Sequence, residues 1–165
     1  MSESVLLLAF VTFQRLGELA WARRNEARLR RAGAVETGAA HYPLIVVLHG
    51  AWLAACWVWG QEGPVVLGWL IVFGLLQAGR IWILATLGGR WTTRVLSVPG
   101  ETLVRRGPYR FVRHPNYLVV ALEMPTLPLA LGLPSVAAIF GLANLGMLAW
   151  RIRVEDRALR PAARA

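Results

Sequence analysis

Residues 64–88 read PVVLGWLIVFGLLQAGRIWILATLG, and Arg80 is the one ionisable side chain in these 25 residues. A helix needs about 20 mostly apolar residues to cross a bilayer. The stretch therefore predicts a membrane-spanning helix that is long enough to tilt. Working outward from it, the same criterion predicts further spans at residues 5–22, 42–60, 117–132 and 134–150. The last two are short and almost directly joined, so we expect them to form a tight helical hairpin.

The composition of the 165-residue chain agrees with an all-α integral membrane protein that has five transmembrane helices in one domain, residues 1–165. Hydrophobic residues make up 56% and charged residues 16%, whereas soluble domains have roughly 45–50% and about 25%. All 18 basic residues are Arg, against 9 acidic residues, for a net charge of +9. The lack of Lys excludes a Schiff-base lysine and a P-loop lysine. The single Cys56 excludes an intrachain disulfide and a multi-cysteine metal site.

The positions of the Arg residues predict how the helices are oriented. Segments 22–41, 90–116 and 151–165 hold every Arg except Arg15 and Arg80. Because excess Arg marks the cytoplasmic side, we expect the N-terminus outside, the C-terminus in the cytoplasm, and a multi-pass protein of a bacterial inner membrane. The Arg excess is then a topology signal, so no nucleic-acid partner is expected, and none of the residue patterns indicates a metal site.

Four ionisable residues lie inside the predicted spans, and such residues are costly enough to be functional candidates. They are accompanied by two polar residues at a similar depth, roughly 12 Å or less from the Arg-rich ends at 1.5 Å per residue. The six are Arg15, Glu18, Arg80, Glu123, His49 and Asn144. One interpretation is paired struts, Arg15 with Glu18 and Arg80 with Glu123. We favour a polar chamber that opens to the cytoplasm below an apolar slot, in which Arg80 and Glu123 contact a lipid-like substrate.

The segment between the third and fourth spans is expected to carry the chemistry. Residues 100–118 read GETLVRRGPYRFVRHPNYL, with prolines at 99, 108 and 115 that require extended or turned backbone. A shaped loop rich in Arg, His, Tyr and Asn is typical of a binding site. The alternative is a basic surface loop that contacts anionic lipid head groups.

The residue order in this loop resembles a known family. GPY at residues 107–109 is followed by RHPNY at residues 113–117, at the start of a helix. Arg151, Glu155 and Asp156 form a second motif at the end of the last span. Together they resemble the isoprenylcysteine carboxyl methyltransferase family, whose members are integral-membrane enzymes that depend on S-adenosylmethionine. The resemblance covers about residues 80–159.

The resemblance implies roles for individual residues. Arg151 stands where the family has an arginine that meets the carboxylate or anionic head of the substrate, so it is the expected catalytic residue. Asp156 stands where the family has a second Glu, and Glu101 where members can carry His. The implied cofactor-binding residues are Glu101, Thr102, Leu103, Val104, Tyr109, His114, Pro115, Asn116, Tyr117 and Glu155.

Elementary chemistry supports a bound S-adenosylmethionine. The chain has no Gly-x-Gly-x-x-Gly after a strand, which excludes a Rossmann site. Glu155 suits the cationic amino-acid end of the cofactor, and His114 with backbone N–H groups suits its carboxylate. The aromatic ring faces of Tyr109 and Tyr117 suit contact with the adenine or with the positively charged sulfonium. Without such a site, Arg151 and Glu155, at i and i+4, would simply pair with each other.

The expected reaction is an in-line methyl transfer to an oxygen that is already anionic, a carboxylate or an acidic enol or phenol, so positioning matters more than a general base. The expected acceptor is a lipophilic small molecule, such as an alkylpyrone or alkylated phenol, that enters from the membrane lipids. Three alternatives stay open. They are a phospholipid amine N-methyltransferase, an NADPH-dependent enzyme like the sterol reductases, which also carry an Arg-His-Pro-Asn-Tyr loop, and a non-enzymatic lipid-binding protein.

Overall fold

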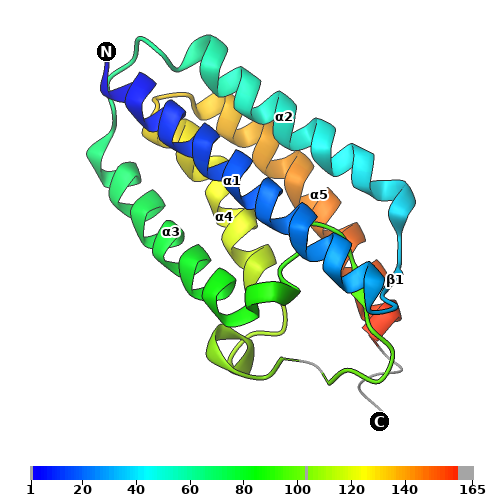
Figure 1. Ribbon diagram of the computed structural model, residues 1–165. Coiled ribbons are helices and arrows are strands. Elements are labelled where there is room, and N and C mark those ends of the chain that lie inside the picture. The colour runs from blue at the N-terminus through cyan, green and yellow to red at the C-terminus, as the bar shows by residue number, and fades with distance from the viewer. Residues whose placement is uncertain (1, 103, 160–165) are drawn as a thin grey trace.

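The computed structural model describes residues 2–102 and 104–159, with side chains described as far as Asp156. In this part of the chain five long helices lie side by side along one direction (Figure 1). They are α1 (Glu3–Arg31), α2 (Tyr42–Trp59), α3 (Leu67–Leu87), α4 (Pro115–Ala130) and α5 (Pro134–Leu159). Because their number is odd, the described chain begins at one end of the bundle and finishes at the other.

Of the described helices, four are long and apolar enough to cross a membrane, namely α1, α2, α3 and α5. The fifth predicted span corresponds to α4, which has 16 residues and contains Pro125 and Pro128. At 1.5 Å per residue α4 is about 24 Å long, which is short of the ~30 Å hydrocarbon thickness. The prediction of five full spans is therefore correct for four helices. A shorter α4 is tolerated because it packs extensively against both α3 and α5, which shield its backbone from lipid.

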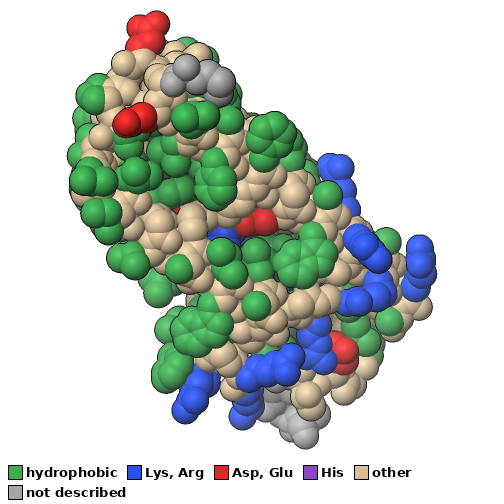
Figure 2. Space-filling view, turned by 60° about the vertical axis from the view of Figure 1, so that its left-hand side comes forward, with side chains coloured by type: hydrophobic (Ala, Val, Ile, Leu, Met, Phe, Trp, Pro, Cys, Tyr) green, Lys and Arg blue, Asp and Glu red, His purple; other side chains and the backbone are tan. Residues whose placement is uncertain are grey.

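Two helices extend well beyond their predicted spans. α1 continues to Arg31 rather than ending near residue 22, because no Gly or Pro follows Gly17 until Gly33, which adopts a left-handed φ of 84°. α5 continues to Leu159 rather than ending at residue 150. Both extensions lie at the end of the molecule where the Arg side chains gather, visible as the blue atoms in the lower part of Figure 2. They enlarge the polar end on which the candidate site is built.

A two-stranded antiparallel ladder departs from the expected all-α fold. β1 (Val35–Glu36) pairs with β2 (Leu96–Ser97), with Val35 opposite Ser97. The ladder is continued by a hydrogen bond from the Thr37 amide to the Val95 carbonyl, 3.0 Å long. It ties the connection between α1 and α2 to the loop between α3 and α4, so two distant segments jointly hold the Arg-rich end.

The apolar core lies toward the other end of the bundle. It is built around Trp52, Phe73 and Leu127, each at most 2% exposed. The Trp52 indole donates to the carbonyl of Met124 at 2.9 Å, which satisfies a polar group that the core would otherwise leave unpaired. Burial of these large side chains locks α2 and α3 against α4.

The charged residues inside the spans form a connected buried ion network. Arg80 pairs with Glu123 and, at 3.0 Å, with Glu18. Arg15 pairs with the same two carboxylates, at 2.9 Å to Glu123 and 3.3 Å to Glu18. Two glutamines that the sequence interpretation overlooked complete the network: Gln77 donates to Glu123, and Gln14 donates to Gln77 and Glu18. Acidic and basic side-chain atoms are visible in a hollow midway along the apolar face in Figure 2.

The other two polar residues of the expected chamber do not join this network. His49 bonds to the carbonyl of Ile45 on its own helix at 2.9 Å, and Asn144 donates to the carbonyl of Val120 at 3.3 Å. The structure contains both ion pairs of the paired-strut interpretation, Arg15 with Glu18 and Arg80 with Glu123, and the polar chamber stays a prediction. Arg80 and Glu123 are buried and Arg15 and Glu18 are partly buried. Mutual pairing stabilises these charges, since a buried charge without a partner is strongly destabilising.

Candidate active site

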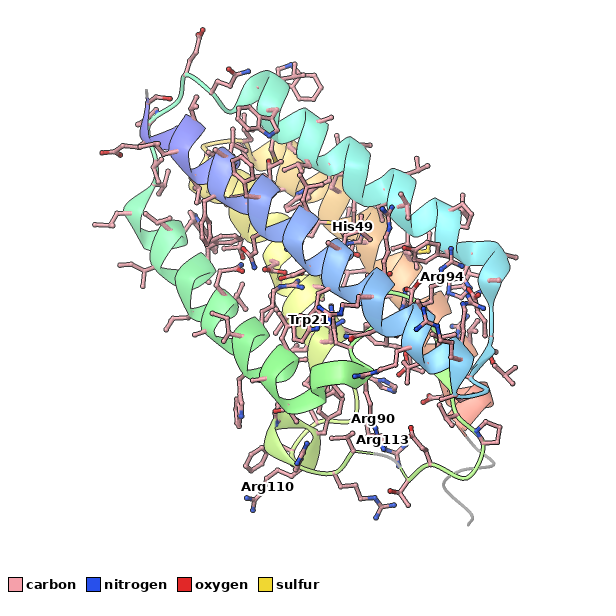
Figure 3. All side chains as sticks on the ribbon, in the orientation of Figure 1. Trp21, His49, Arg90, Arg94, Arg110 and Arg113 are labelled. Atoms are coloured by element: carbon pink, nitrogen blue, oxygen red, sulfur yellow. The ribbon has the colours of Figure 1, made fainter. Side chains whose placement is uncertain are left out.

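A cleft of about 930 Å³ opens at the Arg-rich end of the bundle. Its walls come from the last residues of α1 and α3, the loop between α3 and α4, the first turn of α4 and the end of α5. Arg90, Arg110 and Arg113 lie at this end in Figure 3, whereas His49 lies midway along α2. The cleft brings together eight of the ten residues expected to bind a cofactor: Glu101, Thr102, Val104, Tyr109, His114, Asn116, Tyr117 and Glu155.

The remaining predicted site residues have other positions. Leu103 lies outside the described residues. Pro115 occupies the first turn of α4 and does not line the cleft; there its fixed φ starts the helix without losing a hydrogen bond. Arg80 and Glu123 belong to the buried ion network and do not line the cleft. Their expected contacts with substrate stay a prediction, and the geometry gives them a structural role.

A glycine in the GPY motif sets the loop against α3. Gly107 adopts a φ of 58°, and a Cβ built there would lie 2.4 Å from Oγ1 of Thr86 in the last turn of α3. Any larger residue would both strain the backbone and displace this contact. The close approach positions the short 3₁₀ turn η3 (Gly107–Arg110), and with it Tyr109, at the cleft wall.

Tyr117 joins the two motifs. Arg151 donates from Nε to the Tyr117 hydroxyl oxygen at 2.8 Å, and the hydroxyl in turn donates to Glu155. Arg151 also donates from Nη2 to the Thr93 carbonyl at 2.6 Å and is only 9% exposed. Among the described residues the ion pairs do not include an Arg151–Glu155 pair, so the i, i+4 pairing is replaced by a bridge through Tyr117.

His114 strengthens the same junction. Its Nδ1 lies 3.6 Å from a Glu155 carboxylate oxygen and its Nε2 3.1 Å from one of Asp156. The imidazole stacks on the Tyr117 ring with centroids 5.4 Å apart. The nearby Glu155 carboxylate raises the pKa of His114 above its usual 6.5, and the hydrogen bond with Asp156 adds to the shift, although partial burial opposes it. The contacts of His114 with the two carboxylates therefore tie the end of α5 to the start of α4, and the raised pKa favours the protonated imidazole there.

Two buried polar atoms of cleft residues lack a partner within the described chain. They are the amide oxygen Oδ1 of Asn116 and the indole Nε1 of Trp91. An unpaired buried donor or acceptor costs about 1–3 kcal/mol, so native proteins rarely leave one unless a ligand or water completes it. Both residues line the same cleft, so one unpaired acceptor and one unpaired donor fit a ligand that carries both kinds of group, such as a nucleoside.

Residues 69–161 match the isoprenylcysteine carboxyl methyltransferase (ICMT) family. The chain belongs to this family. It is also 38% identical over 160 residues to the uncharacterized protein YpbQ of Bacillus subtilis (strain 168), a match that covers 94% of this chain and 95% of that protein. No solved structure matches the chain.

The ICMT match confirms the family resemblance of the two motifs. It begins in α3 and runs through α5, so it contains the loop, Tyr117 and the Arg151–Asp156 segment. α1 and α2 lie outside it, although Leu29 of α1 still lines the cleft. Membership of a methyltransferase family, together with the apolar helices, identifies a multi-pass membrane methyltransferase.

Tyr109 enters the ICMT cleft as a neutral phenol. Burial raises its pKa, and the nearby Glu155 carboxylate raises it further. The hydroxyl is therefore protonated at neutral pH, which excludes a phenolate at this position and leaves a donor for a ligand.

Arg94 borders the ICMT cleft, but its guanidinium is engaged by other side chains of the protein. It pairs with Glu36 at 2.6 Å and Glu26 at 3.6 Å, and its guanidinium carbon lies 4.0 Å from the centre of the Tyr42 ring. Burial alone would raise the pKa of Glu36, but hydrogen bonds from Arg94 and Arg30 lower it below its usual value. The structure thus shows Arg94 bracing the β1–β2 region.

Trp91 is one of the cleft residues that sequence reasoning missed. The chain has eight Trp residues, and Trp is common at membrane interfaces, so its count does not single out Trp91. Its position directly after the Gly88–Arg90 turn, outside the apolar run, was the available signal. Only the packed loop shows that it is 6% exposed and lines the cleft.

Proposed function

We propose that this ICMT-family protein transfers a methyl group from S-adenosylmethionine to an oxygen of a lipophilic small molecule. The observation that carries the proposal is the junction of Tyr117, Glu155 and His114. It brings both family motifs to one cleft, next to Asn116, whose Oδ1 has no partner in the described chain. A volume of about 930 Å³ is within the usual range for small-molecule sites, roughly 300–1,000 Å³.

The residues of the cleft offer a suitable group for each part of the cofactor. Glu155 would face the ammonium, and protonated His114 would attract the carboxylate. Asn116 Oδ1 accepts from an amino group, and Trp91 Nε1 donates to a ring nitrogen or hydroxyl. When bound, S-adenosylmethionine supplies an activated methyl group on its sulfonium. The protein's part is to bind, orient and exclude water.

Arg151 is suited to hold the acceptor oxygen. Two of its five guanidinium donors are used within the described chain, one by Tyr117 and one by Thr93. Arg151 lines the cleft, so the other donors would serve an anionic ligand there. The Tyr117 and Thr93 bonds prevent the guanidinium from rotating, so an anionic oxygen would be held in one orientation. Orientation of this kind lowers the barrier without a general base, provided that the acceptor is already ionised.

Binding of the reaction product distinguishes the classes of function. Titration calorimetry of the detergent-solubilised protein should show binding of S-adenosylhomocysteine and none of NADPH. The reverse result would assign a reductase instead, and binding of neither would support a lipid-binding protein. Transfer of labelled methyl groups to alkylphenols, alkylpyrones and fatty carboxylates should exceed transfer to phospholipid amines. Preferential labelling of the amines would contradict O-methylation and favour the N-methyltransferase alternative.

A further inference from the structure

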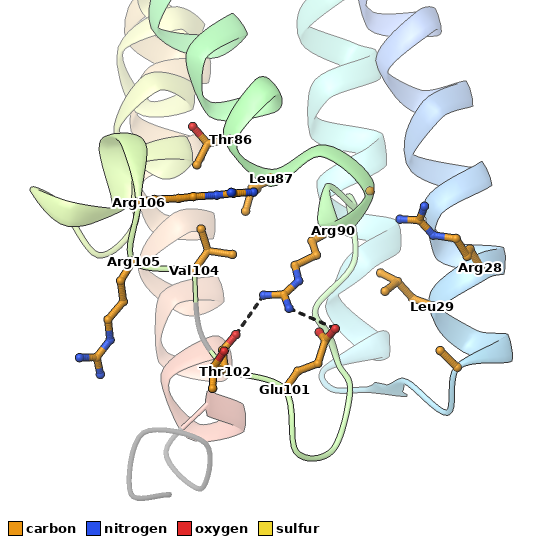
Figure 4. A pocket seen from close by; sticks show the side chains of 12 residues that line it. Arg28, Leu29, Thr86, Leu87, Arg90, Glu101, Thr102, Val104, Arg105 and Arg106 are labelled. Carbon is orange, nitrogen blue, oxygen red and sulfur yellow. Dashed lines mark hydrogen bonds and ion pairs between the residues drawn. The ribbon is translucent and has the colours of Figure 1, made fainter.

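A second pocket of about 760 Å³ lies beside the cleft, between the ends of α1 and α3 and the loop at residues 101–106 (Figure 4). We call it the arginine pocket, because Arg28, Arg90, Arg105 and Arg106 line it against a single carboxylate, Glu101. Four positive charges less one negative charge leave a formal charge of +3.

Two arginines of this pocket, Arg28 and Arg90, are held in place by backbone contacts. A Cβ built on Gly89 would lie 1.6 Å from Nη2 of Arg28, so the guanidinium rests directly on the glycine backbone. Arg90 donates from Nη1 to the Thr102 carbonyl at 3.0 Å, and its Nη2 lies 3.1 Å from Glu101. In Figure 4 the guanidinium groups of Arg28, Arg90 and Arg106 lie around the pocket, whereas that of Arg105 points away from it.

The positive charge of the pocket exceeds what the described chain neutralises. Within residues 2–102 and 104–156, the ion pairs of the lining arginines are limited to that of Arg90 with Glu101. A guanidinium fork matches the oxygens of a phosphate, and charge-assisted hydrogen bonds of this kind are roughly twice as strong as neutral ones. The pocket is therefore built for an oxyanion.

The position of the pocket relative to the membrane interface indicates the source of that oxyanion. Thr86 and Leu87, in the last turn of α3, line it. One turn earlier on α3, Trp82 is 51% exposed, and on α1 the half-exposed Trp21 precedes Arg28 by seven residues, or roughly 10 Å. Exposed Trp residues at helix ends mark the membrane interface. The pocket thus lies at the level of lipid head groups.

We propose that the arginine pocket binds the phosphodiester group of an anionic membrane phospholipid through Arg28, Arg90 and Arg106. Basic pockets between helices at the Arg-rich side of a membrane protein are suited to such head groups. The pocket adjoins the cleft and shares Arg90, Glu101, Thr102 and Val104 with it, whereas Arg28 and Arg106 line this pocket and not the cleft. The lipid site goes beyond the proposed activity, and its test at Arg28 and Arg106 does not depend on that activity.

Lipid retention tests the proposal without any enzymatic assay. The protein is reconstituted in nanodiscs of phosphatidylcholine with phosphatidylglycerol, extracted gently, and analysed by native mass spectrometry for bound lipid. Wild type should retain phosphatidylglycerol, and the R28Q/R106Q variant should bind it about 30-fold more weakly. That factor corresponds to about 2 kcal/mol for two arginines at about 1 kcal/mol each.

Arg31→Gln is the matched control, because Arg31 is an exposed arginine on the same helix that does not line the pocket. It should retain phosphatidylglycerol like wild type. Melting temperatures verify folding, and the single variants R28Q and R106Q carry the test if the double variant does not fold.

Competition separates a lipid from free phosphate. Short-chain phosphatidylglycerol should displace the retained lipid, and inorganic phosphate at the same concentration should not. The proposal is overturned if phosphatidylcholine is retained equally, if Arg31→Gln loses as much lipid as the pocket variants, or if inorganic phosphate competes as well as the lipid.

Discussion

Arg151 of α5 donates a hydrogen bond from Nε to the hydroxyl oxygen of Tyr117 in the first turn of α4, 2.8 Å away. The two residues are 34 positions apart, and the guanidinium carbon lies 5.5 Å from the centre of the Tyr117 ring. Because the same hydroxyl donates to Glu155, one phenol orients both the residue expected to hold the acceptor and a residue expected to hold the cofactor. The catalytic geometry thus depends on the packing of α4 against α5.

Arg151→Ala should affect the acceptor far more than the cofactor. Loss of a charge-assisted hydrogen bond, worth about 1.5–3 kcal/mol, should lower kcat/KM for the acceptor about 10- to 100-fold. Affinity for S-adenosylhomocysteine, measured by calorimetry, should change little. Arg153→Ala is the control, since Arg153 is exposed on the same helix. An equal loss of cofactor affinity in Arg151→Ala would contradict this division of roles.

Tyr117→Phe should destabilise the junction between α4 and α5. The substitution keeps the ring but leaves the buried Arg151 Nε and the Glu155 carboxylate without their shared partner, at an expected cost of about 1–3 kcal/mol. The melting temperature in detergent should fall. Tyr109→Phe provides the comparison, because the hydrogen bonds of the described residues do not include its hydroxyl, and it should melt close to wild type. Equal melting of the two variants would show that the Tyr117 bridge contributes little.

The stabilising effect of His114 should depend on pH. Its folded-state pKa is raised, chiefly by the nearby Glu155 carboxylate, so the protonated form is favoured by folding. That contribution is fully present below the unfolded value of 6.5 and is lost as pH rises through the higher folded value. The difference in melting temperature between wild type and His114→Gln should therefore be larger near about pH 6 than near about pH 9. A difference that grows with pH would be inconsistent with a protonated His114.

Trp91→Phe should weaken binding of S-adenosylhomocysteine about three- to tenfold, the usual worth of one neutral hydrogen bond. The phenyl ring retains most of the packing and removes only the indole N–H, which has no acceptor in the described chain. Trp82→Phe is a matched control, because Trp82 is half-exposed on α3 and does not line the cleft. If both variants bind the ligand like wild type, the Trp91 indole does not donate to it.

Glu123→Gln distinguishes a structural role of the buried ion network from a substrate contact. Removing one charge of a buried pair costs about 3–5 kcal/mol, so the variant should melt well below wild type. The double variant R80M/E123L, which removes both charges, should recover part of the loss. A variant that melts normally but has a raised KM for the acceptor would instead support the substrate role expected of Glu123 and Arg80.

Local signals in the sequence were sufficient for much of the architecture. Hydrophobic runs predict where the helices lie, because a segment that crosses the bilayer must be both long enough and apolar enough. Pro115 marks the start of α4, since proline fits the first turn of a helix and not its interior. The motif at residues 113–117 and the one at Arg151–Glu155 indicated the family and most of the residues that line the cleft. The extents of α1 and α5 were underestimated, because a helix outside the membrane needs no apolar run.

The tertiary structure determined which groups the charged side chains contact. Arg80 and Glu123 were expected to contact substrate, yet in the structure they form ion pairs with Glu18 and Arg15 of α1. Arg151 and Glu155 had the spacing of a helical ion pair, yet Tyr117 lies between them. A sequence determines which charges exist and on which helix face they lie. Which opposite charge or hydroxyl each one contacts depends on how separate helices pack. The partners lie far apart in the sequence, so no local pattern predicts these contacts.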